Sequence, residues 1–124
     1  MAHRFAAAGD NVALFARSGE YLSTIAEEIR AETPGTPLAV ETDVADASAV
    51  ASGFETVRDA FSSVDRLVFT SGSPSAGGGI LEVEPEEFRD VLDTRLRGAF
   101  RCVREAAGDM VDDGGGTVVV TNSG

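Results

Sequence analysis

Apolar residues follow two alternating spacings along the chain. Short runs at 11–16, 37–41, 67–70 and 117–121 predict strands, and the first of them is almost continuously apolar, as is typical of a buried parallel strand. Between these runs, apolar residues recur every three or four positions, which predicts helices at 2–8, after Ser18, after Asp46 and over 85–110. Ser18 and Asp46 are the expected N-caps. This alternation predicts an α/β fold with a parallel sheet, in a single domain over 1–124.

The segment from Pro85 to Met110 is the longest expected helix, with proline in its first turn. At 1.5 Å per residue, one continuous α-helix of this length would measure ~39 Å. Its apolar positions are Phe88, Val91, Leu92, Leu96, Ala99, Phe100, Val103, Ala106 and Met110.

Composition narrows the classes of partner. Ten basic residues, all arginine, stand against 21 acidic ones, which gives a net charge of −11. Nucleic acid and anionic membrane surfaces are therefore excluded as expected partners. This acidity without lysine predicts a salt-adapted source, because concentrated salt screens the self-repulsion; an ordinary acidic bacterial protein is the alternative.

Other simple features exclude further classes. No apolar run approaches the ~20 residues of a membrane helix, and a cytoplasmic protein is the expectation. The single cysteine, Cys102, excludes an internal disulfide framework and a cysteine-based zinc site, and we expect it to pack rather than react. The acidic run from Glu82 to Glu87 is interpreted as a solvated face, and no metal site is predicted.

Four segments, in chain order, resemble the short-chain dehydrogenase/reductase (SDR) family. They are residues 14–18 (LFARS), 42–44 (TDV), 65–72 (DRLVFTSG) and 116–123 (GTVVVTNS). Residues 86–98 also match the long helix of that family. The resemblance implies a partial doubly wound, Rossmann-like parallel sheet that lacks the family's first strand and its C-terminal part.

The resemblance places the adenosine ribose of a nicotinamide cofactor beside Arg17. Ala16 occupies the position of the usual acidic residue, and the planar guanidinium of Arg17 suits a phosphate, which favours NADP(H) over NAD(H). Ser18 would add a hydroxyl donor. The alternative is that Arg17 is a surface charge and Ser18 only a helix cap.

Further cofactor contacts follow from the same resemblance. The Asp43 side chain and the Val44 backbone would hold the adenine edge, unless Asp43 merely caps a turn. Phe69, Ser71 and Gly72 lie in the family's Asn-Asn-Ala-Gly turn, where only the glycine is retained, so their contacts would come largely from the backbone.

The resemblance makes Ser123 the catalytic serine, which hydrogen-bonds the substrate carbonyl or hydroxyl. Arg95 stands where the family usually has an asparagine that anchors a water in the proton relay. Arginine cannot accept a hydrogen bond, so the relay is expected to differ. His3, near the start of the chain, is interpreted as incidental.

Two parts of the family's machinery lie outside these 124 residues. They are the glycine-rich turn after the first strand and the Tyr-x-x-x-Lys pair; the only tyrosine is Tyr21, and there is no lysine. Hydride transfer by the chain alone is therefore not expected. In the family the missing strand lies between the strands equivalent to 11–16 and 67–70. These strands should either pair directly or keep bare edges, and bare edges favour an aggregated, molten or oligomeric state.

The leading hypothesis is a fragment of an NADP(H)-dependent SDR that acts on an alcohol or carbonyl substrate and forms a homo-oligomer through helix 85–110. The first alternative is a non-catalytic remnant that binds a partner subunit through the same helix. The second alternative is an unrelated α/β binding domain.

Overall fold

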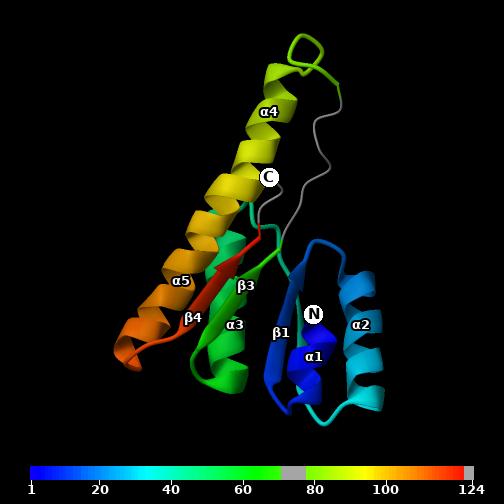
Figure 1. Ribbon diagram of the computed structural model, residues 1–124, viewed down its shortest axis with the longest axis vertical. Helices are drawn as coiled ribbons and strands as arrows, with labels where there is room; N and C mark the ends of the chain where they lie inside the picture. Colours follow the sequence, from blue (N-terminus) through cyan, green and yellow to red (C-terminus); the bar gives the residue numbers. More distant parts are fainter. Residues whose placement is uncertain (71–77, 122–124) are drawn as a thin grey trace. The chain divides into compact units, whose positions relative to one another are not determined.

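The computed structural model describes residues 1–70 and 78–121 (Figure 1). Its elements are α1 (Ala2–Ala7), β1 (Asn11–Ala16), α2 (Gly19–Glu32), β2 (Thr36–Glu41), α3 (Ala47–Phe61), β3 (Arg66–Phe69), α4 (Pro85–Leu92), η1 (Asp93–Arg97), α5 (Gly98–Asp112) and β4 (Thr117–Val120). The four strands agree with the sequence prediction to within one residue at each end. The long helix does not.

The strands form two parallel pairs. In the first sheet β1 pairs with β2, in register from Asn11 opposite Thr36 to Ala16 opposite Glu41. In the second, β3 pairs with β4, from Arg66 opposite Thr117 to Phe69 opposite Val120. Each described sheet therefore consists of two strands.

The chain divides into two compact units, each with one sheet. Unit 1 comprises Met1–Asp43 and Ser52–Ser62, and unit 2 comprises Val44–Ala51 and Ser63–Gly124. Helix α3 thus contributes its beginning to unit 2 and its remainder to unit 1.

In unit 1, α2 packs against both β1 and β2. The helix begins as predicted: Ser18 Oγ accepts a hydrogen bond from the Tyr21 N–H at 3.3 Å. Leu22, Ala26 and Ile29 recur at helical spacing and are almost fully buried. The amphipathic pattern therefore predicted the face that packs on the sheet.

The rest of α3 packs on β1 within unit 1. Phe54 and Val57 are buried, and the Phe54 ring meets the Phe15 ring edge to face, with centroids 5.4 Å apart. The guanidinium carbon of Arg58 lies 5.7 Å from the centre of the same Phe54 ring. Aromatic packing therefore holds this part of α3 to the strand.

In unit 2, α5 supplies three of the buried apolar side chains. Cys102, Ala106 and Met110 are buried at four-residue spacing, and Phe69 at the end of β3 is buried too. The neighbouring strand β4 differs, because Val118, Val119 and Val120 are each 40–49% exposed. The strand predicted at 117–121 is therefore confirmed, and its valine side chains are exposed.

The long helix predicted over 85–110 is present, but it is not α-helical throughout. Between α4 and α5 the five residues of η1 form a π-helical turn, in which the Gly98 N–H donates to the Asp93 carbonyl. A π turn holds one extra residue and so rotates the rest of the helix about its axis. After the turn, Gly98 meets Val44 so closely that a Cβ on Gly98 would lie 2.9 Å from Val44 Cγ2.

No helix of the described residues is long and apolar enough to cross a membrane.

Truncating Ile29 should test how far unit 1 depends on α2. Ile29 is 0% exposed, so Ile29→Ala should lower the free energy of unfolding by about 2–5 kcal/mol, measured by urea denaturation with far-ultraviolet circular dichroism. The matched control is Ile80→Ala, because Ile80 is 90% exposed and should change stability by no more than about 0.5 kcal/mol. Equal effects of the two substitutions would contradict this account of the core.

Candidate functional site

The carboxyl ends of β1 and β2 bring three predicted site residues to one edge of the sheet in unit 1. Arg17 and Ser18 follow β1 directly, and Asp43 comes two residues after the last residue of β2. The ladder continues past the strands, because the Thr42 N–H donates to the Ala16 carbonyl at 2.8 Å. Ligands of open parallel sheets bind at such carboxyl ends.

Arg17 and Ser18 are both exposed at this edge. The Ser18 oxygen caps α2, as expected from the alternative in which Ser18 is a helix cap. Because that oxygen acts as an acceptor, its own O–H can still donate to a ligand. The arrangement therefore offers one guanidinium and one hydroxyl in adjacent positions.

Asp46, rather than Asp43, caps the following helix. Its Oδ1 accepts hydrogen bonds from Ser48 Oγ at 2.7 Å, the Ser48 N–H at 2.9 Å and the Ala49 N–H at 3.3 Å. The Ser48 hydroxyl and these backbone donors lower the pKa of the Asp46 carboxyl, because they stabilise its charged form. Asp43 is exposed at the sheet edge and is not needed for this cap.

In unit 2, Val44 is held by two contacts from the long helix. Its carbonyl accepts a hydrogen bond from Arg101 Nη1 at 2.9 Å, and its side chain packs against Gly98. The same Nη1 atom lies 3.4 Å from the Asp93 carbonyl in the π turn. Sequence reasoning missed Arg101, because nothing in the local pattern indicates that its side chain turns toward a distant carbonyl.

A backbone hydrogen bond holds the carboxyl end of β3, in unit 2, at Phe69. Its carbonyl accepts from the Thr121 N–H at 3.0 Å, and its side chain is 6% exposed. The side chain therefore belongs to the core, which leaves the backbone for any cofactor contact. Ser71, Gly72 and Ser123 lie outside the described residues.

Arg95 lies in the π turn η1 and is exposed. Single π turns inside α-helices frequently occur at functional sites. The position at which the family usually has asparagine is thus a specialised turn here, with a permanent positive charge.

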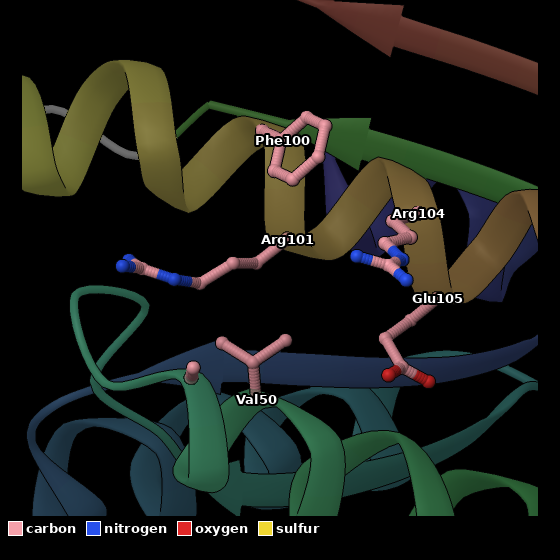
Figure 2. A pocket seen from close by; sticks show the side chains of 6 residues that line it. Val50, Phe100, Arg101, Arg104 and Glu105 are labelled. Atoms are coloured by element: carbon pink, nitrogen blue, oxygen red, sulfur yellow. The ribbon is translucent and has the colours of Figure 1, made fainter.

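A cavity of about 250 Å³ lies in unit 2 between the start of α3 and the helix α5 (Figure 2). It is lined by Ala47, Val50, Phe100, Arg101, Arg104 and Glu105. Figure 2 shows Val50 pointing from α3 toward α5, from which the two arginines and Glu105 project. None of the predicted site residues within 1–70 and 78–121 lines this cavity.

Sequence reasoning also missed Glu41, the last residue of β2. A Cβ built on Gly19 would lie 2.6 Å from Glu41 Oε2, so the carboxylate reaches the first residue of α2. The signal for this contact is the register that places Glu41 opposite Ala16, and a single sequence does not give that register.

Groups suited to metal or thiol chemistry are not found in the described part of the chain. No three His, Cys, Asp or Glu residues within 1–70 and 78–121 are arranged to hold a metal ion. Cys102 is 3% exposed, and burial raises the pKa of its thiol to about 11. The thiol is therefore neutral near pH 7.

Parallel α/β units of this kind place their ligand sites at the carboxyl ends of the strands. A family model described as short chain dehydrogenase matches residues 1–124. The chain therefore belongs to the short-chain dehydrogenase/reductase family, as the resemblance predicted.

Individual relatives agree with this assignment. The chain is 32% identical over 124 residues to a 3-oxoacyl-[acyl-carrier-protein] reductase FabG of Staphylococcus aureus, covering 99% of this chain and 50% of the relative. It is 33% identical over 119 residues to 2-dehydro-3-deoxy-L-rhamnonate dehydrogenase (NAD(+)) of a Sphingomonas species, covering 96% and 46%. The crystal structure of L-sorbose reductase from Gluconobacter frateurii, complexed with NADPH and L-sorbose, matches with a TM-score of 0.89 at 28% identity, covering 96% and 45%. The chain spans about half the length of these relatives.

The buried thiol gives a direct test of the core of unit 2. The thiolate is the reactive form of cysteine, so native Cys102 should react slowly with a thiol reagent at pH 8 and quickly after unfolding in urea. With the thiol pKa at about 11, the native rate should rise roughly tenfold per pH unit and level off only near that pH. The stability contributed by the protonated thiol is lost progressively between the unfolded pKa of ~8.5 and the folded pKa of about 11. The chain has one cysteine, so the whole signal comes from this residue. Rapid native labelling at pH 8 would show that α5 is not packed as described.

Proposed function

We propose that the chain is part of an NADP(H)-dependent short-chain dehydrogenase/reductase that transfers hydride between the nicotinamide cofactor and an alcohol or carbonyl substrate. The observation that carries the proposal is the placement of Arg17, Ser18 and Asp43 at one sheet edge in a chain of this family. Residues 1–124 are interpreted as one incomplete dinucleotide-binding domain of a cytoplasmic enzyme.

Support for the cofactor class comes from the chemistry of the residues and from the relatives. One relative is named for NAD(+), and one matching structure was solved with NADPH. In this chain Ala16 removes the usual acidic partner of a ribose 2′-hydroxyl, and Arg17 offers a planar donor to a 2′-phosphate. NADP(H) is therefore proposed over NAD(H).

Each proposed residue has a binding or positioning role. Arg17 and Ser18 bind the adenosine ribose end, and Asp43 and the Val44 backbone bind the adenine edge. Phe69, Ser71 and Gly72 line the cofactor through their backbone. The bound cofactor would supply or accept the hydride.

At the reacting end, Ser123 holds the substrate oxygen by a hydrogen bond. A proton must also move to or from that oxygen, and tyrosine with a neighbouring cation does this in the family. Because these 124 residues contain neither a tyrosine after Ser123 nor any lysine, the chain by itself is proposed to bind nucleotide without transferring hydride.

A second candidate function is partner binding through helix 85–110, and two observations favour it. Phe88, Leu96 and Phe100 are 58–66% exposed on this helix, and exposed apolar side chains of this kind are typical of interaction sites. Charge also separates along the helix: residues 84–93 carry five acidic side chains and one basic, whereas residues 94–104 carry four arginines and no acid. Two antiparallel copies would place acidic segments beside basic ones. We propose a homo-oligomer through this helix.

Replacing Arg17 tests the proposed nucleotide site. Arg17→Gln should weaken binding of adenosine 2′,5′-bisphosphate about tenfold, because a charge-assisted hydrogen bond to phosphate is lost. Binding of adenosine 5′-monophosphate should change less than about twofold. Both affinities can be measured by calorimetric titration of the 124-residue chain, with Arg30→Gln as a control from the far end of α2. Equal losses for both nucleotides, or none, would contradict the assignment of Arg17.

Replacing Leu96 tests the oligomer. Leu96→Ser should shift the mass measured by light scattering toward the 12.8 kDa monomer, because it removes an apolar contact from the centre of the exposed helix face. Leu81→Ser is the matched control, since Leu81 is 96% exposed and precedes α4. The proposal predicts an unchanged mass for that control. If both variants keep the wild-type mass, the helix is not the interface.

A further inference from the structure

The carboxylate that Ala16 lacks is present on the neighbouring strand. In dinucleotide-binding folds, an acidic residue near the end of the second strand hydrogen-bonds the ribose 2′-hydroxyl. In this chain the equivalent of that strand is β1, which ends in Ala16. The register partner of Ala16 on the neighbouring strand β2 is Glu41. Directly paired residues project to the same face of a sheet. Glu41 therefore lies next to Ala16 on the same face.

The position of Gly19 shows where this carboxylate goes. Glu41 Oε2 lies 2.6 Å from the point that a Gly19 Cβ would occupy, and the carboxyl carbon lies 3.6 Å from it. Any other residue at 19 would displace the carboxylate. The glutamate therefore reaches across the sheet edge to the start of α2, immediately after Arg17 and Ser18 in the chain. All these residues belong to unit 1.

We propose that Glu41 is a specificity-determining residue, which accepts a hydrogen bond from the ribose 2′-hydroxyl and opposes a 2′-phosphate. This inference rests on the proposed nucleotide site. Arg17 attracts the phosphate and Glu41 repels it, so discrimination between NADP(H) and NAD(H) is weaker than Arg17 alone would give. The preference comes from two charges of opposite sign on neighbouring strand ends.

Neutralising Glu41 is the first test. Glu41→Gln keeps the size of the side chain and removes its charge. The measured quantity is the affinity for adenosine 2′,5′-bisphosphate divided by the affinity for adenosine 5′-monophosphate. It should rise about fivefold, as expected for removing one like charge near a phosphate at the protein surface. The Tyr21 ring provides the signal in an NMR titration, because it is the only tyrosine and lies in the first turn of α2.

Displacing the carboxylate without removing its charge is the second test. Gly19→Ala introduces a methyl group where Glu41 Oε2 now lies, and the end of a glutamate side chain can move away. The affinity ratio should again rise, by about twofold or more, because the charge is then farther from the phosphate. Glu27→Gln is the matched control; this exposed glutamate lies in the middle of α2 and should leave the ratio unchanged.

The outcomes separate this inference from the proposed function. A raised ratio in both Glu41→Gln and Gly19→Ala, which falls back toward wild type in about 1 M salt, supports the role of Glu41. If both nucleotides bind but either variant leaves the ratio unchanged, Glu41 does not act from this position, and the proposed function still stands. If neither nucleotide binds the wild-type chain or any variant, the proposed nucleotide site and this inference both fail.

Discussion

The backbone ladder between two parallel strands is the interaction on which each unit depends. Each described sheet has only two strands, and a sheet of that size is at best marginally stable in water. The additional stability must come from helices that cover the strands. In unit 1 the buried face of α2 and the contact between Phe15 and Phe54 provide it, and in unit 2 the buried face of α5 does.

The same ladders position the candidate site. A parallel register fixes which residues end side by side, and in unit 1 it places Ala16 and Glu41 together, with Arg17 one residue further on. A shift of one residue would turn Glu41 to the other face and leave Arg17 beside a different neighbour. In unit 2, the Arg101 side chain fixes backbone positions in a similar way, because one guanidinium nitrogen lies near both the Val44 and the Asp93 carbonyl oxygens. The backbone at two points far apart in the sequence is thus fixed by a single side chain.

Hydrophobic spacing was sufficient to predict the strands and the buried face of α2, and the cap-forming side chains of Ser18 and Asp46 predicted the two helix starts. These features depend on residues within a few positions of one another. The π turn at η1 was missed because no local spacing signals it. The contact of Gly98 with Val44 was missed because the two residues are more than fifty positions apart in the chain. The roles of Glu41 and Arg101 were missed for the same reason, since both depend on which segments lie side by side. The positions of Arg17 and Asp43 at one sheet edge could be predicted, because strand ends are local and parallel pairing brings them together.

The acidity of the chain bears on how such a site selects its nucleotide. A net charge of −11 opposes every anionic ligand at long range, and a 2′-phosphate adds to that repulsion. Salt screens charges separated by more than a Debye length, which is ~8 Å at physiological ionic strength and ~3 Å at 1 M. Distant acidic residues are therefore screened more strongly than Arg17 or Glu41 at the strand ends. In concentrated salt the general repulsion fades first, and the balance between these two side chains decides which ribose the site accepts.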